Sequence, residues 1–515
     1  MNICLIRPST VLRLLSITVK PSAPLGLAFI AGALRAAGHH VTVIDAIAEA
    51  PEQFLPFERD IVINGLSNEE ILERVPENTD LIGLTIMFTN NWLNDRRLID
   101  FLGDNLPDVP IIAGGEHITG MANICIKQTR HLKVCVLGEG EETIVELADA
   151  FYYNKPLETV SGIAFRNEDN ECIAPPRRTR IKNVDNIVLP AWDLFPLEVY
   201  RAYELSYGVV KGQLSLPIMA TRGCPYQCTF CSSPQMWGTR YYMRTAREVV
   251  DEIESYINDF DASNFDFYDL TAIIKREWII EFAQELIRRE LNITWQIPAG
   301  TRAEAIDDEV ARYLYKSGCR NITYAPESGS PEILKIIKKK VKLDKMLESI
   351  RYSHKEKMNI KLNMIIGFPE EKHRHIWQTM WFLVKCGWYG VDDIFPTVLV
   401  PYSGCELFEN LRKQNKIDPE NDEYYYNIIL GDSFFSSHFY NENMSQLTVR
   451  IYRLLYLLIF YGTSFLSRPK RIYKLITNVY KGRPESRGEQ RLYEVLKRNK
   501  NKQNKIPKYD TVSHH

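Results

Sequence analysis

Three cysteines near the middle of the chain stand at spacings that suit a metal cluster. Cys224, Cys228 and Cys231 lie within eight residues and form a C-x3-C-x2-C pattern. Three thiolates on one short loop can ligate three irons of a [4Fe–4S] cluster, which leaves the fourth iron without a protein ligand. An iron with an open position can bind a molecule and pass an electron to it. The pattern therefore predicts redox chemistry at this loop.

Two simpler explanations of the three cysteines fit less well. A structural zinc site needs four closed ligands. The nearest further cysteines are Cys172 and Cys319, and the nearest histidines, His131 and His354, are also distant in sequence. A metal-free cluster of buried cysteines does not explain the glycine that precedes the loop, Gly223. An open iron–sulfur site is the favoured prediction.

The cysteine loop resembles that of the radical S-adenosylmethionine (SAM) superfamily. The resemblance implies that the methionine part of SAM binds the open iron, and that one electron cleaves SAM to a 5′-deoxyadenosyl radical. Two later segments look like the superfamily's strand ends beside SAM, namely Tyr324–Ser330 with its Glu-Ser-Gly-Ser sequence and Ile366–Glu370 with its Gly-Phe-Pro sequence. The resemblance implies the following SAM contacts: Phe230, Glu327, Ser328, Asn363 and Gly367.

Glycine-rich turns follow two predicted strands in the first part of the chain, at Gly114-Gly115 and at Gly138-Glu139-Gly140. Such turns let a ligand approach the backbone closely, although tight strand–helix connections have the same composition. Their order resembles the cobalamin-binding domain that is fused to many radical SAM enzymes. The resemblance implies the following cobalamin contacts: Leu25, Gly26, Thr85, Gly114, Gly115, His117, Gly138, Glu139 and Gly140.

One loop departs from the usual cobalamin pattern. Many cobalamin domains offer a histidine in an Asp-x-His-x-x-Gly loop as the lower ligand of cobalt. The segment Asp45–Ala50 has neither the histidine nor the glycine, so histidine ligation from this loop is excluded. His117 stands on another turn, and we expect it to contact the corrin or its side chains rather than cobalt. The alternative is an ordinary hydrogen-bonded histidine.

Short apolar runs alternate with helical segments along the chain, which indicates parallel sheets covered by helices. Ligands of such sheets lie at the carboxyl ends of the strands. We predict an α/β protein with an N-terminal Rossmann-like doubly wound sheet, a partial (β/α)6 barrel and a mainly helical C-terminal region. The predicted divisions are 1–150 (cobalamin domain), 151–210 (linker), 211–410 (radical SAM barrel), 411–495 (helical domain) and 496–515 (disordered tail). The strands are predicted at 2–6, 41–44, 81–86, 109–113 and 134–137, and then at 217–221, 264–268, 294–297, 321–325, 361–366 and 393–399.

Composition limits the partners of this 515-residue chain. Its formal net charge of -2 supports no nucleic-acid partner. The N-terminus lacks a secretory signal and no run of 18 apolar residues occurs, so we predict a cytoplasmic protein. The helical stretch Ser445–Leu466 is apolar with basic flanks. We expect it to be a core helix that caps the barrel, and the alternative is a contact with a membrane surface or a lipid-like substrate.

Cobalamin together with a deoxyadenosyl radical implies methylation of an unactivated carbon or phosphorus in a small-molecule or lipid-like substrate. An oxidative ring closure, as in the anaerobic magnesium-protoporphyrin ester cyclases, is the alternative within the superfamily. A non-catalytic cobalamin or iron–sulfur sensor is the alternative from another class. Methylthiotransferases carry a second cysteine trio, whereas Cys4, Cys125 and Cys135 are far apart in sequence. Tyr402 is the favoured pocket residue, ahead of Trp295 and Cys405, and a flavodoxin or ferredoxin is the expected reductant.

Overall fold

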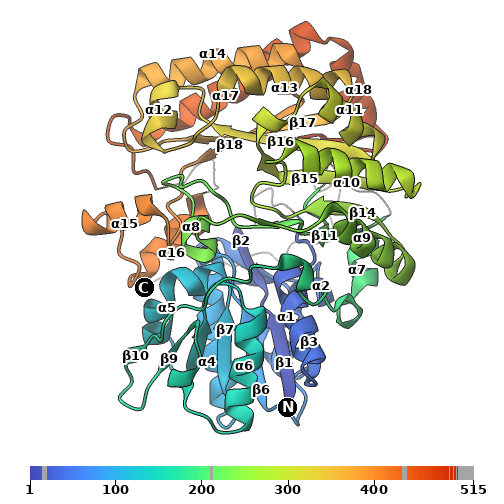
Figure 1. The fold of residues 1–515 in the computed structure, drawn as a ribbon. Coiled ribbons are helices and arrows are strands. Elements are labelled where there is room, and N and C mark those ends of the chain that lie inside the picture. Colours follow the sequence, from blue (N-terminus) through green and yellow to red (C-terminus); the bar gives the residue numbers. More distant parts are fainter. Residues whose placement is uncertain are drawn as a thin grey trace.

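The chain forms two α/β bodies that lie end to end, with a helical layer on the outer side of the second (Figure 1). The computed structural model describes residues 1–13, 20–208, 213–431, 438–486, 488–490, 492–493 and 496. The predicted tail, 496–515, therefore lies almost entirely outside the described residues. The N-terminal body begins at one end of the molecule, and the six-stranded sheet of the second body occupies the other end.

The N-terminal body is built around a seven-stranded sheet of order β10-β9-β8-β7-β6-β1-β3. Alternate residues of β1 enter two separate cores, with Ile3 and Leu5 on the side of α1 and α6 and Cys4 and Ile6 on the side of α4 and α5. The sheet is thus covered on both faces, as predicted. The strands are β1 (Asn2–Arg7), β3 (His40–Asp45), β6 (Leu81–Thr85), β7 (Ile111–Gly114), β8 (Leu132–Val136), β9 (Ile163–Arg166) and β10 (Cys172–Ile173), and the helices are α1 (Leu25–Ala36), α2 (Ala46–Glu49), α3 (Asn68–Leu72), α4 (Trp92–Asn105), α5 (Glu116–Gln128) and α6 (Glu141–Tyr152).

Strand order places a ligand crevice in this sheet. The first strand, β1, lies between β3 and β6, and both neighbours run parallel to it. The chain connections leave in opposite directions on the two sides of β1, so the carboxyl ends of β1 and β6 border a topological switch point. The loop after β6 carries Met87 and Phe88 at this point.

Two parts of the N-terminal body differ from the sequence prediction. Residues 163–173, inside the predicted linker, form β9 and β10, which extend the sheet in antiparallel pairing beside β8. A small antiparallel sheet of β2 (Thr10–Arg13), β4 (Phe54–Pro56) and β5 (Ile61–Asn64) was also not predicted. These strands are two to four residues long, too short for their apolar periodicity to stand out.

The second body is a six-stranded, all-parallel sheet in the order β11-β14-β15-β16-β17-β18. Each strand falls on or beside a predicted one, and the fold class is confirmed. The strands are β11 (Leu214–Ile218), β14 (Ala262–Phe267), β15 (Thr294–Thr301), β16 (Cys319–Glu327), β17 (Asn359–Ile366) and β18 (Asp393–Val398), with a hairpin of β12 (Thr221–Arg222) and β13 (Tyr242–Met243) after the first. The helices are α7 (Leu197–Ala202), α8 (Ser233–Trp237), α9 (Ala246–Phe260), α10 (Arg276–Arg288), α11 (Asp308–Lys316), α12 (Pro331–Ile336), α13 (Leu343–Lys355) and α14 (His373–Tyr389).

The C-terminal helices divide between the two bodies. Helix α16 (Asp422–Gly431) packs on the N-terminal body, where Arg96 forms a two-pronged pair with Asp422. Helix α17 (Gln446–Ser467) packs against α14 and β18 of the barrel. By length and composition α17 is able to cross a membrane, and no other helix of the described residues meets that test. The remaining helices are α15 (Glu406–Lys413) and α18 (Lys470–Tyr480).

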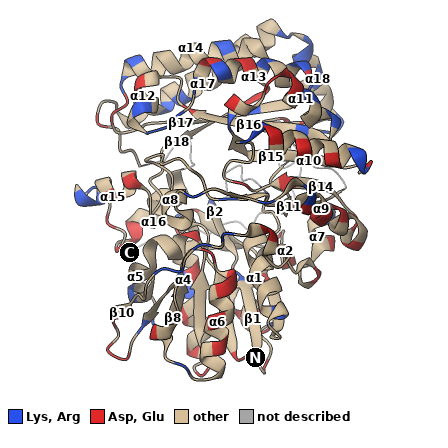
Figure 2. Cartoon of the chain, viewed as in Figure 1, with Lys and Arg blue, Asp and Glu red and all other residues tan. Residues whose placement is uncertain are grey.

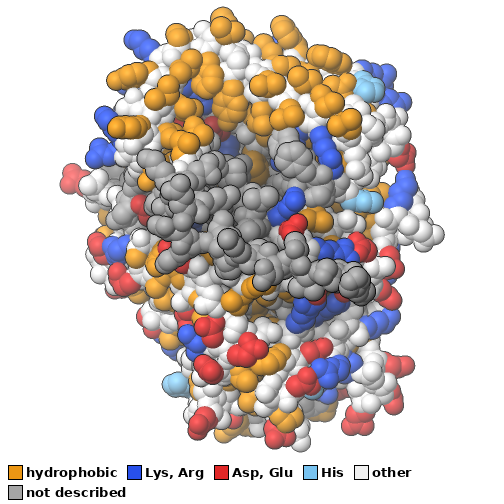
Figure 3. All heavy atoms as spheres, turned by 180° about the vertical axis from the view of Figure 1, so that it is seen from behind, with side chains coloured by type: hydrophobic (Ala, Val, Ile, Leu, Met, Phe, Trp, Pro, Cys, Tyr) orange, Lys and Arg blue, Asp and Glu red, His pale blue; other side chains and the backbone are white. Residues whose placement is uncertain are grey.

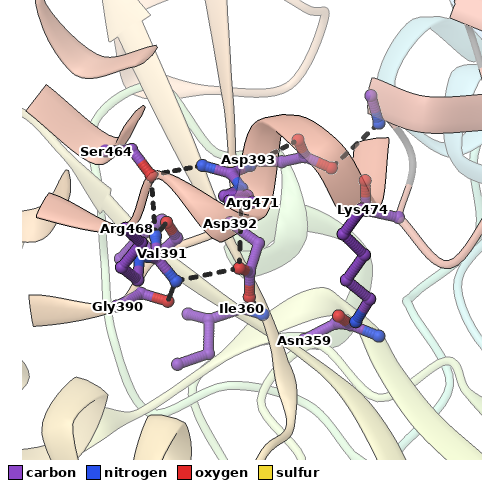
Figure 4. A network of polar contacts seen from close by, with 12 residues as sticks. Asn359, Ile360, Gly390, Val391, Asp392, Asp393, Ser464, Arg468, Arg471 and Lys474 are labelled. Carbon is purple, nitrogen blue, oxygen red and sulfur yellow. Dashed lines mark hydrogen bonds and ion pairs between the residues drawn. The ribbon is translucent and has the colours of Figure 1, made fainter. Parts of the chain in front are cut away.

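A polar network fastens the turn between α17 and α18 to the barrel (Figure 4). Arg468 Nη1 lies 3.1 Å from Asp392 Oδ1 and also donates to the carbonyl oxygen of Gly390 at 2.9 Å. Arg471 Nη2 approaches Asp393 at 3.7 Å. These ion pairs are largely shielded from water, so they fix the direction in which α17 and α18 leave the barrel.

Candidate functional site

The three cysteines lie on the loop between β12 and β13, directly after the first barrel strand. Gly223 opens this loop with φ +89°, a conformation that side chains disfavour. A Cβ atom at Gly223 would also collide with the carbonyl oxygen of Arg240 and the guanidinium of Arg180. Only glycine therefore lets the backbone turn here and place the cysteine loop at the carboxyl edge of the sheet.

Backbone hydrogen bonds hold the middle of the cysteine loop. The Thr229 N–H donates to Ile337 at 3.1 Å, and the Thr229 carbonyl accepts from the N–H of Leu407 at 2.8 Å. The Cys231 N–H donates to the Cys228 carbonyl at 3.1 Å, which closes a turn between two of the cysteines. The loop is thus pinned from two sides, by the end of α12 and by the start of α15.

The thiols are partly buried and carry identifiable partners. Cys231 Sγ lies 3.1 Å from Ser233 Oγ. Burial raises the pKa of the Cys228 and Cys231 thiols, and at Cys228 the nearby charges of Lys339 and Arg302 act in the opposite direction. The cysteines therefore lie beside positive charge in a partly dehydrated loop, which is a setting that favours metal thiolates once a metal displaces the protons.

The metal-binding capacity of the loop rests on its three thiols. Among the residues that the structure describes, no three His, Cys, Asp or Glu side chains form a group able to hold one metal ion. A cubane cluster does not need such convergence, because each of three cysteines binds a different iron. The three thiols on the pinned loop offer one ligand to each of three irons, as a [4Fe–4S] cluster needs.

A buried ion pair stands beside the cysteine loop. Glu327, at the end of β16, lies 2.9 Å from Lys339 Nζ. Glu327 has φ +66°, unusual for a residue with a side chain, and burial raises the pKa of its carboxyl. Arg302, at the end of β15, stacks 3.3 Å above the ring centroid of Tyr226 in the cysteine loop. Carboxylate, ammonium and guanidinium groups thus surround the loop and suit the charged ends of an amino acid.

The other predicted SAM residues occupy neighbouring strand ends. Phe230 contacts Phe368 with their ring centroids 5.9 Å apart. Asn363, on β17, donates from Nδ2 to the Ala299 carbonyl at 3.4 Å, while its Oδ1 is buried without a partner. Gly367 has φ +94° and ends β17. The orphaned oxygen of Asn363 is an acceptor that a bound nucleoside would satisfy, so these residues fit SAM.

Ser328, also a predicted SAM contact, lies in the turn after β16. It is fully buried, and its Oγ lies 3.2 Å from Thr379 Oγ1 and accepts from the N–H of Ser330 at 3.1 Å. The hydroxyl thus shapes the turn after β16 rather than facing the cysteine loop. Both hydrogen bonds of this hydroxyl lie inside the turn, and a SAM contact of Ser328 stays a prediction.

The carboxyl edges of the two sheets face one another. Thr89, after β6, lies 3.3 Å from Ser403, after β18, through their hydroxyl oxygens. Ser232 in the α8 segment donates to Glu116 at the start of α5. Arg222, in β12, forms ion pairs with Glu139 at 3.3 Å and with Glu141, and all three side chains are nearly buried. The cysteine loop is therefore fixed close to the strand ends of the N-terminal body.

The strand ends of the N-terminal body offer an apolar edge. Met87 and Phe88 follow β6 at the switch point and keep 41% and 63% of their surface exposed. Thr85 is partly exposed at the same edge, and Gly26 lies in open space at the start of α1. Exposed large apolar side chains on an edge that faces another domain indicate a ligand surface, and a flat macrocycle such as a corrin fits this chemistry.

Three of the predicted cobalamin residues have side chains that pack against other parts of the chain. His117 is 1% exposed and belongs to helix α5. Its Nδ1 lies 3.1 Å from Thr89 Oγ1 and its Nε2 lies 3.6 Å from Cys125 Sγ. Leu25, the first residue of α1, is 3% exposed and lies in the hydrophobic core. Glu139 is engaged by Arg222, Arg180 and the Ile181 N–H. In this structure these three side chains contact other residues of the chain, and their corrin contacts stay a prediction.

The glycines of the predicted cobalamin turns serve chain packing as well. Gly115 has φ +124°, and a Cβ there would collide with the Ile86 carbonyl. A Cβ at Gly140 would lie 2.8 Å from Ile30. Gly138, with φ +75°, donates its N–H to Thr119 Oγ1 at 3.0 Å. A Cβ at Gly114 would make an ordinary van der Waals contact with Val136. These turns are therefore tight, and a ligand would meet their outer side.

Of the three candidate pocket residues, only Tyr402 reaches the surface, with 43% exposure. Trp295 is fully buried and donates from Nε1 to Ser317 O at 3.1 Å. Cys405 is buried and caps α15 by accepting from the Phe408 N–H at 3.3 Å. Tyr402 follows β18 beside Ser403, at the meeting point of the two edges, and stays the favoured substrate residue.

Sequence reasoning missed several residues of this site. Lys339 and Arg302 come from separate strand–helix connections, and only the barrel brings them to the cysteine loop. A weak signal was present, because Lys339 belongs to the run Lys338–Lys340 just after the Glu-Ser-Gly-Ser segment. Met87 and Phe88 had a clearer one, since two large apolar residues follow directly after a predicted strand.

Comparison with known proteins agrees with the two-body architecture. Residues 18–148 match the family described as the B12 binding domain, and residues 218–383 match the radical SAM superfamily. An uncharacterized methyltransferase of Pyrococcus horikoshii is 27% identical over 89% of this chain and 93% of its own length. The cytidylyl-2-hydroxyethylphosphonate methyltransferase of Streptomyces wedmorensis is 27% identical over 78% of this chain and 80% of its own.

Two further comparisons concern a different activity and the fold. The anaerobic magnesium-protoporphyrin IX monomethyl ester cyclase of Rubrivivax gelatinosus is 25% identical over 75% of this chain and 66% of its own. The solved structure of the radical SAM methyltransferase TsrM from Kitasatospora setae, with cobalamin and a [4Fe–4S] cluster bound, has a TM-score of 0.63. It is 17% identical and covers 80% of this chain and 78% of that chain, which shows a shared fold.

Proposed function

Because the chain is a radical SAM enzyme with an N-terminal B12-binding domain, we propose that it methylates an unactivated carbon or phosphorus of a small-molecule or lipid-like substrate. Its cofactors are a [4Fe–4S] cluster, SAM and cobalamin. When bound, SAM and the cluster supply a 5′-deoxyadenosyl radical that removes hydrogen from the substrate, and cobalamin supplies the methyl group. The observation that carries the proposal is the contact of the two strand-end edges, which Thr89 and Ser403 bring together.

The proposal assigns roles to the chain's own residues. Cys224, Cys228 and Cys231 hold the cluster. Glu327 and Lys339 offer a carboxylate and an ammonium to the charged amino acid end of SAM, and Asn363 accepts from its nucleoside. The position of these groups at the ends of β16 and β17 supports the assignment. Met87, Phe88 and Tyr402 line the space between the edges and exclude water from it.

Methylation of phosphorus or carbon is favoured over other radical reactions by the relatives that match most of both chains. Both are named methyltransferases. We further propose that the enzyme works in the cytoplasm and takes its electron from a flavodoxin or ferredoxin, since the cluster of such an enzyme needs a one-electron donor. No feature of the composition supports a nucleic-acid substrate.

The experiment that tests the function uses anaerobically reconstituted protein with SAM, cobalamin and dithionite. We expect release of 5′-deoxyadenosine, together with S-adenosylhomocysteine and a product heavier by one methyl group when an extract of the source cells supplies the substrate. Cys228→Ala should lose the cluster absorbance and most of the iron, while Cys172→Ala, remote from the loop, should keep both. Equal iron in the two variants would remove the trio as ligands.

Oxidative ring closure is the second candidate, favoured by the similarity to the cyclase of Rubrivivax gelatinosus. The same assay separates the two reactions. A cyclase would form 5′-deoxyadenosine and a product that has lost hydrogens, without S-adenosylhomocysteine. A protein that forms no 5′-deoxyadenosine at all, even slowly without substrate, would be a non-catalytic cobalamin or iron–sulfur sensor, and the enzymatic proposal would fail.

A further inference from the structure

One side of helix α17 exposes a row of apolar side chains, with a gap at Gly462. Leu447, Ile451, Leu454, Leu458 and Leu466 recur at helical spacing and keep 65%, 48%, 45%, 67% and 84% of their surface exposed. The opposite side of α17 packs on the barrel through Val449, Tyr456 and Phe460, all buried. The inner side of α17 is therefore part of the core, and its outer side is exposed.

Helix α14 runs beside α17 and exposes three tryptophans. Trp377, Trp381 and Trp388 are 57%, 62% and 63% exposed. His373 Nδ1 lies 2.7 Å from Tyr452 Oη, and a Cβ at Gly387 would lie 3.1 Å from the Phe460 carbonyl. The two helices therefore pack closely along their lengths. Figure 3 shows hydrophobic side chains gathered over the end of the molecule where these helices lie.

Helix α18, which packs against α17, exposes further apolar side chains. Ile472, Tyr473, Ile476 and Tyr480 are 42%, 76%, 59% and 91% exposed, and Val479 is the only buried residue of the helix. The network of Arg468 and Arg471 with Asp392 and Asp393 holds α18 in this position (Figure 4). We call the exposed side chains of α14, α17 and α18 given above the C-terminal apolar face.

The segment that carries most of this face contains no acidic residue. Between Glu442 and Glu485 there is no Asp or Glu, but there are eight basic residues: Arg450, Arg453, Arg468, Lys470, Arg471, Lys474, Lys481 and Arg483. Lys470, Lys481 and Arg483 are exposed. In Figure 2 the ribbon of α18 carries the blue of Lys and Arg. The face is therefore apolar in its middle and positive at one margin.

We propose that the C-terminal apolar face docks on the surface of a bilayer that contains anionic lipids, with α17 lying in the plane of the interface. Exposed leucines would enter the acyl boundary, tryptophans favour the headgroup level, and lysines attract anionic headgroups. A helix that spans the bilayer would have to leave β18, to which Arg453 Nε is bound through the Pro396 carbonyl at 2.8 Å. Surface docking keeps this buried contact.

The charge of this segment favours an anionic bilayer over a second copy of the chain as the binding partner. A two-fold dimer through this face would bring the same surface of each copy together. The acid-free segment of one copy would then oppose the acid-free segment of the other, and like charges at an interface cost free energy. An anionic bilayer instead complements the positive margin while it covers the leucines and tryptophans.

The test is flotation of the full chain with extruded vesicles of phosphatidylcholine, with and without phosphatidylglycerol. We expect the protein to float with the anionic vesicles and much less with the neutral ones, and high salt should weaken the binding. Leu454→Glu with Leu458→Glu should lower the partition coefficient about tenfold or more, because each exposed leucine contributes by burial. Tyr152→Glu with Tyr153→Glu is the matched control, since these residues are 63% and 62% exposed on the N-terminal body.

A second variant, Ile476→Glu on α18, covers the case in which the leucine pair unfolds the protein, and thermal unfolding of each variant reports folding. Weak flotation of the wild type with anionic vesicles overturns the proposal, as does equal flotation of wild type and both folded variants. A dimer in sedimentation velocity that the variants dissolve, without vesicle binding, would show that the face joins two copies. Because no cofactor is needed for flotation, its failure leaves the methyltransferase proposal untouched.

Discussion

The imidazole of His117 is enclosed by the rings of Trp92 and Tyr425, with centroids 5.1 and 6.2 Å away. Burial lowers its pKa to about 3, whereas a histidine in the unfolded chain titrates near 6.5. Between these values the unfolded chain binds a proton that the folded protein does not bind. The free energy of unfolding therefore falls as the pH drops below the unfolded value, by up to about 1.4 kcal/mol per pH unit.

We predict that His117→Gln removes this dependence. Glutamine keeps hydrogen-bonding ability without a basic nitrogen, so its contribution does not change with pH. Urea unfolding of the apo protein near pH 7 and near pH 5 measures the effect. Between pH 7 and pH 5 the unfolding free energy of the wild type should fall by about 2 kcal/mol more than that of the variant. An unchanged difference would show that His117 is protonated in the folded protein.

Asn363 offers a second prediction for a single side chain. Its Oδ1 is buried without a partner, and an unsatisfied buried acceptor costs about 1–3 kcal/mol. We expect Asn363→Ala to leave the thermal stability of the SAM-free protein nearly unchanged or raised, and to weaken SAM binding about tenfold. Calorimetric titration of the reconstituted protein with SAM measures this. A variant that loses stability but binds SAM normally would place Asn363 outside the SAM site.

Single residues differ in how far the sequence predicts them. The cysteines were predicted because their chemistry depends on spacing within one loop. Lys339 and Arg302 were not, because only the barrel places them beside that loop. The burial of His117 was not visible in the sequence for a different reason. His117 follows a glycine turn in sequence, but the helix that starts there turns its side chain into the core.

At the scale of elements, the turn that begins the cysteine loop depends on Gly223. We predict that Gly223→Ala lowers iron content after reconstitution and lowers thermal stability, because a side chain there is strained at φ +89° and collides with Arg240. Backbone strain of this kind costs about 1–3 kcal/mol before the collision is counted. Iron assay and thermal unfolding measure both effects.

Gly26→Ala is the matched control for Gly223→Ala. Gly26 lies in the first turn of α1, with no atom within 4 Å of an added Cβ. Alanine favours helix by up to about 1 kcal/mol, so this variant should keep its iron and its stability. Iron loss in Gly26→Ala as well would mean that the assay reports general fragility rather than the geometry of the cysteine loop.

Helices and strands were predictable where one sequence signal, such as a continuous apolar run, was strong. The buried parallel strands are continuous apolar runs, and each predicted run became a strand. The antiparallel strands β9 and β10 were missed because they are short, and the pairing of β9 with β8 and of β10 with β9 forms only in the folded sheet. Helix α17 was predicted from its composition, but its two sides, one packed and one bare, depend on where α14 and β18 lie.

At the scale of the whole molecule, catalysis by the proposed reaction needs the two bodies in register. The radical site lies on the barrel and the methyl carrier on the N-terminal sheet, so one substrate must reach both. A nearly buried charge cluster holds the bodies together, with Arg222 5%, Glu139 6% and Glu141 12% exposed in their side chains. Removing one side of a buried ion pair typically costs about 3–5 kcal/mol, since the other charge is left uncompensated.

We predict that Glu139→Gln with Glu141→Gln uncouples the two half-reactions. The variant keeps the barrel residues, so SAM cleavage to 5′-deoxyadenosine should persist. The methylated product should fall about tenfold or more for every 1.4 kcal/mol lost in the docking of the two bodies. The ratio of product to 5′-deoxyadenosine is the measurement. Glu142→Gln is the control. The Glu142 side chain is 57% exposed, and its ion pair with Arg178 is loose, at 3.7 Å. Loss of both products in equal proportion would mean that these carboxylates support the cysteine loop itself rather than the alignment of the two bodies.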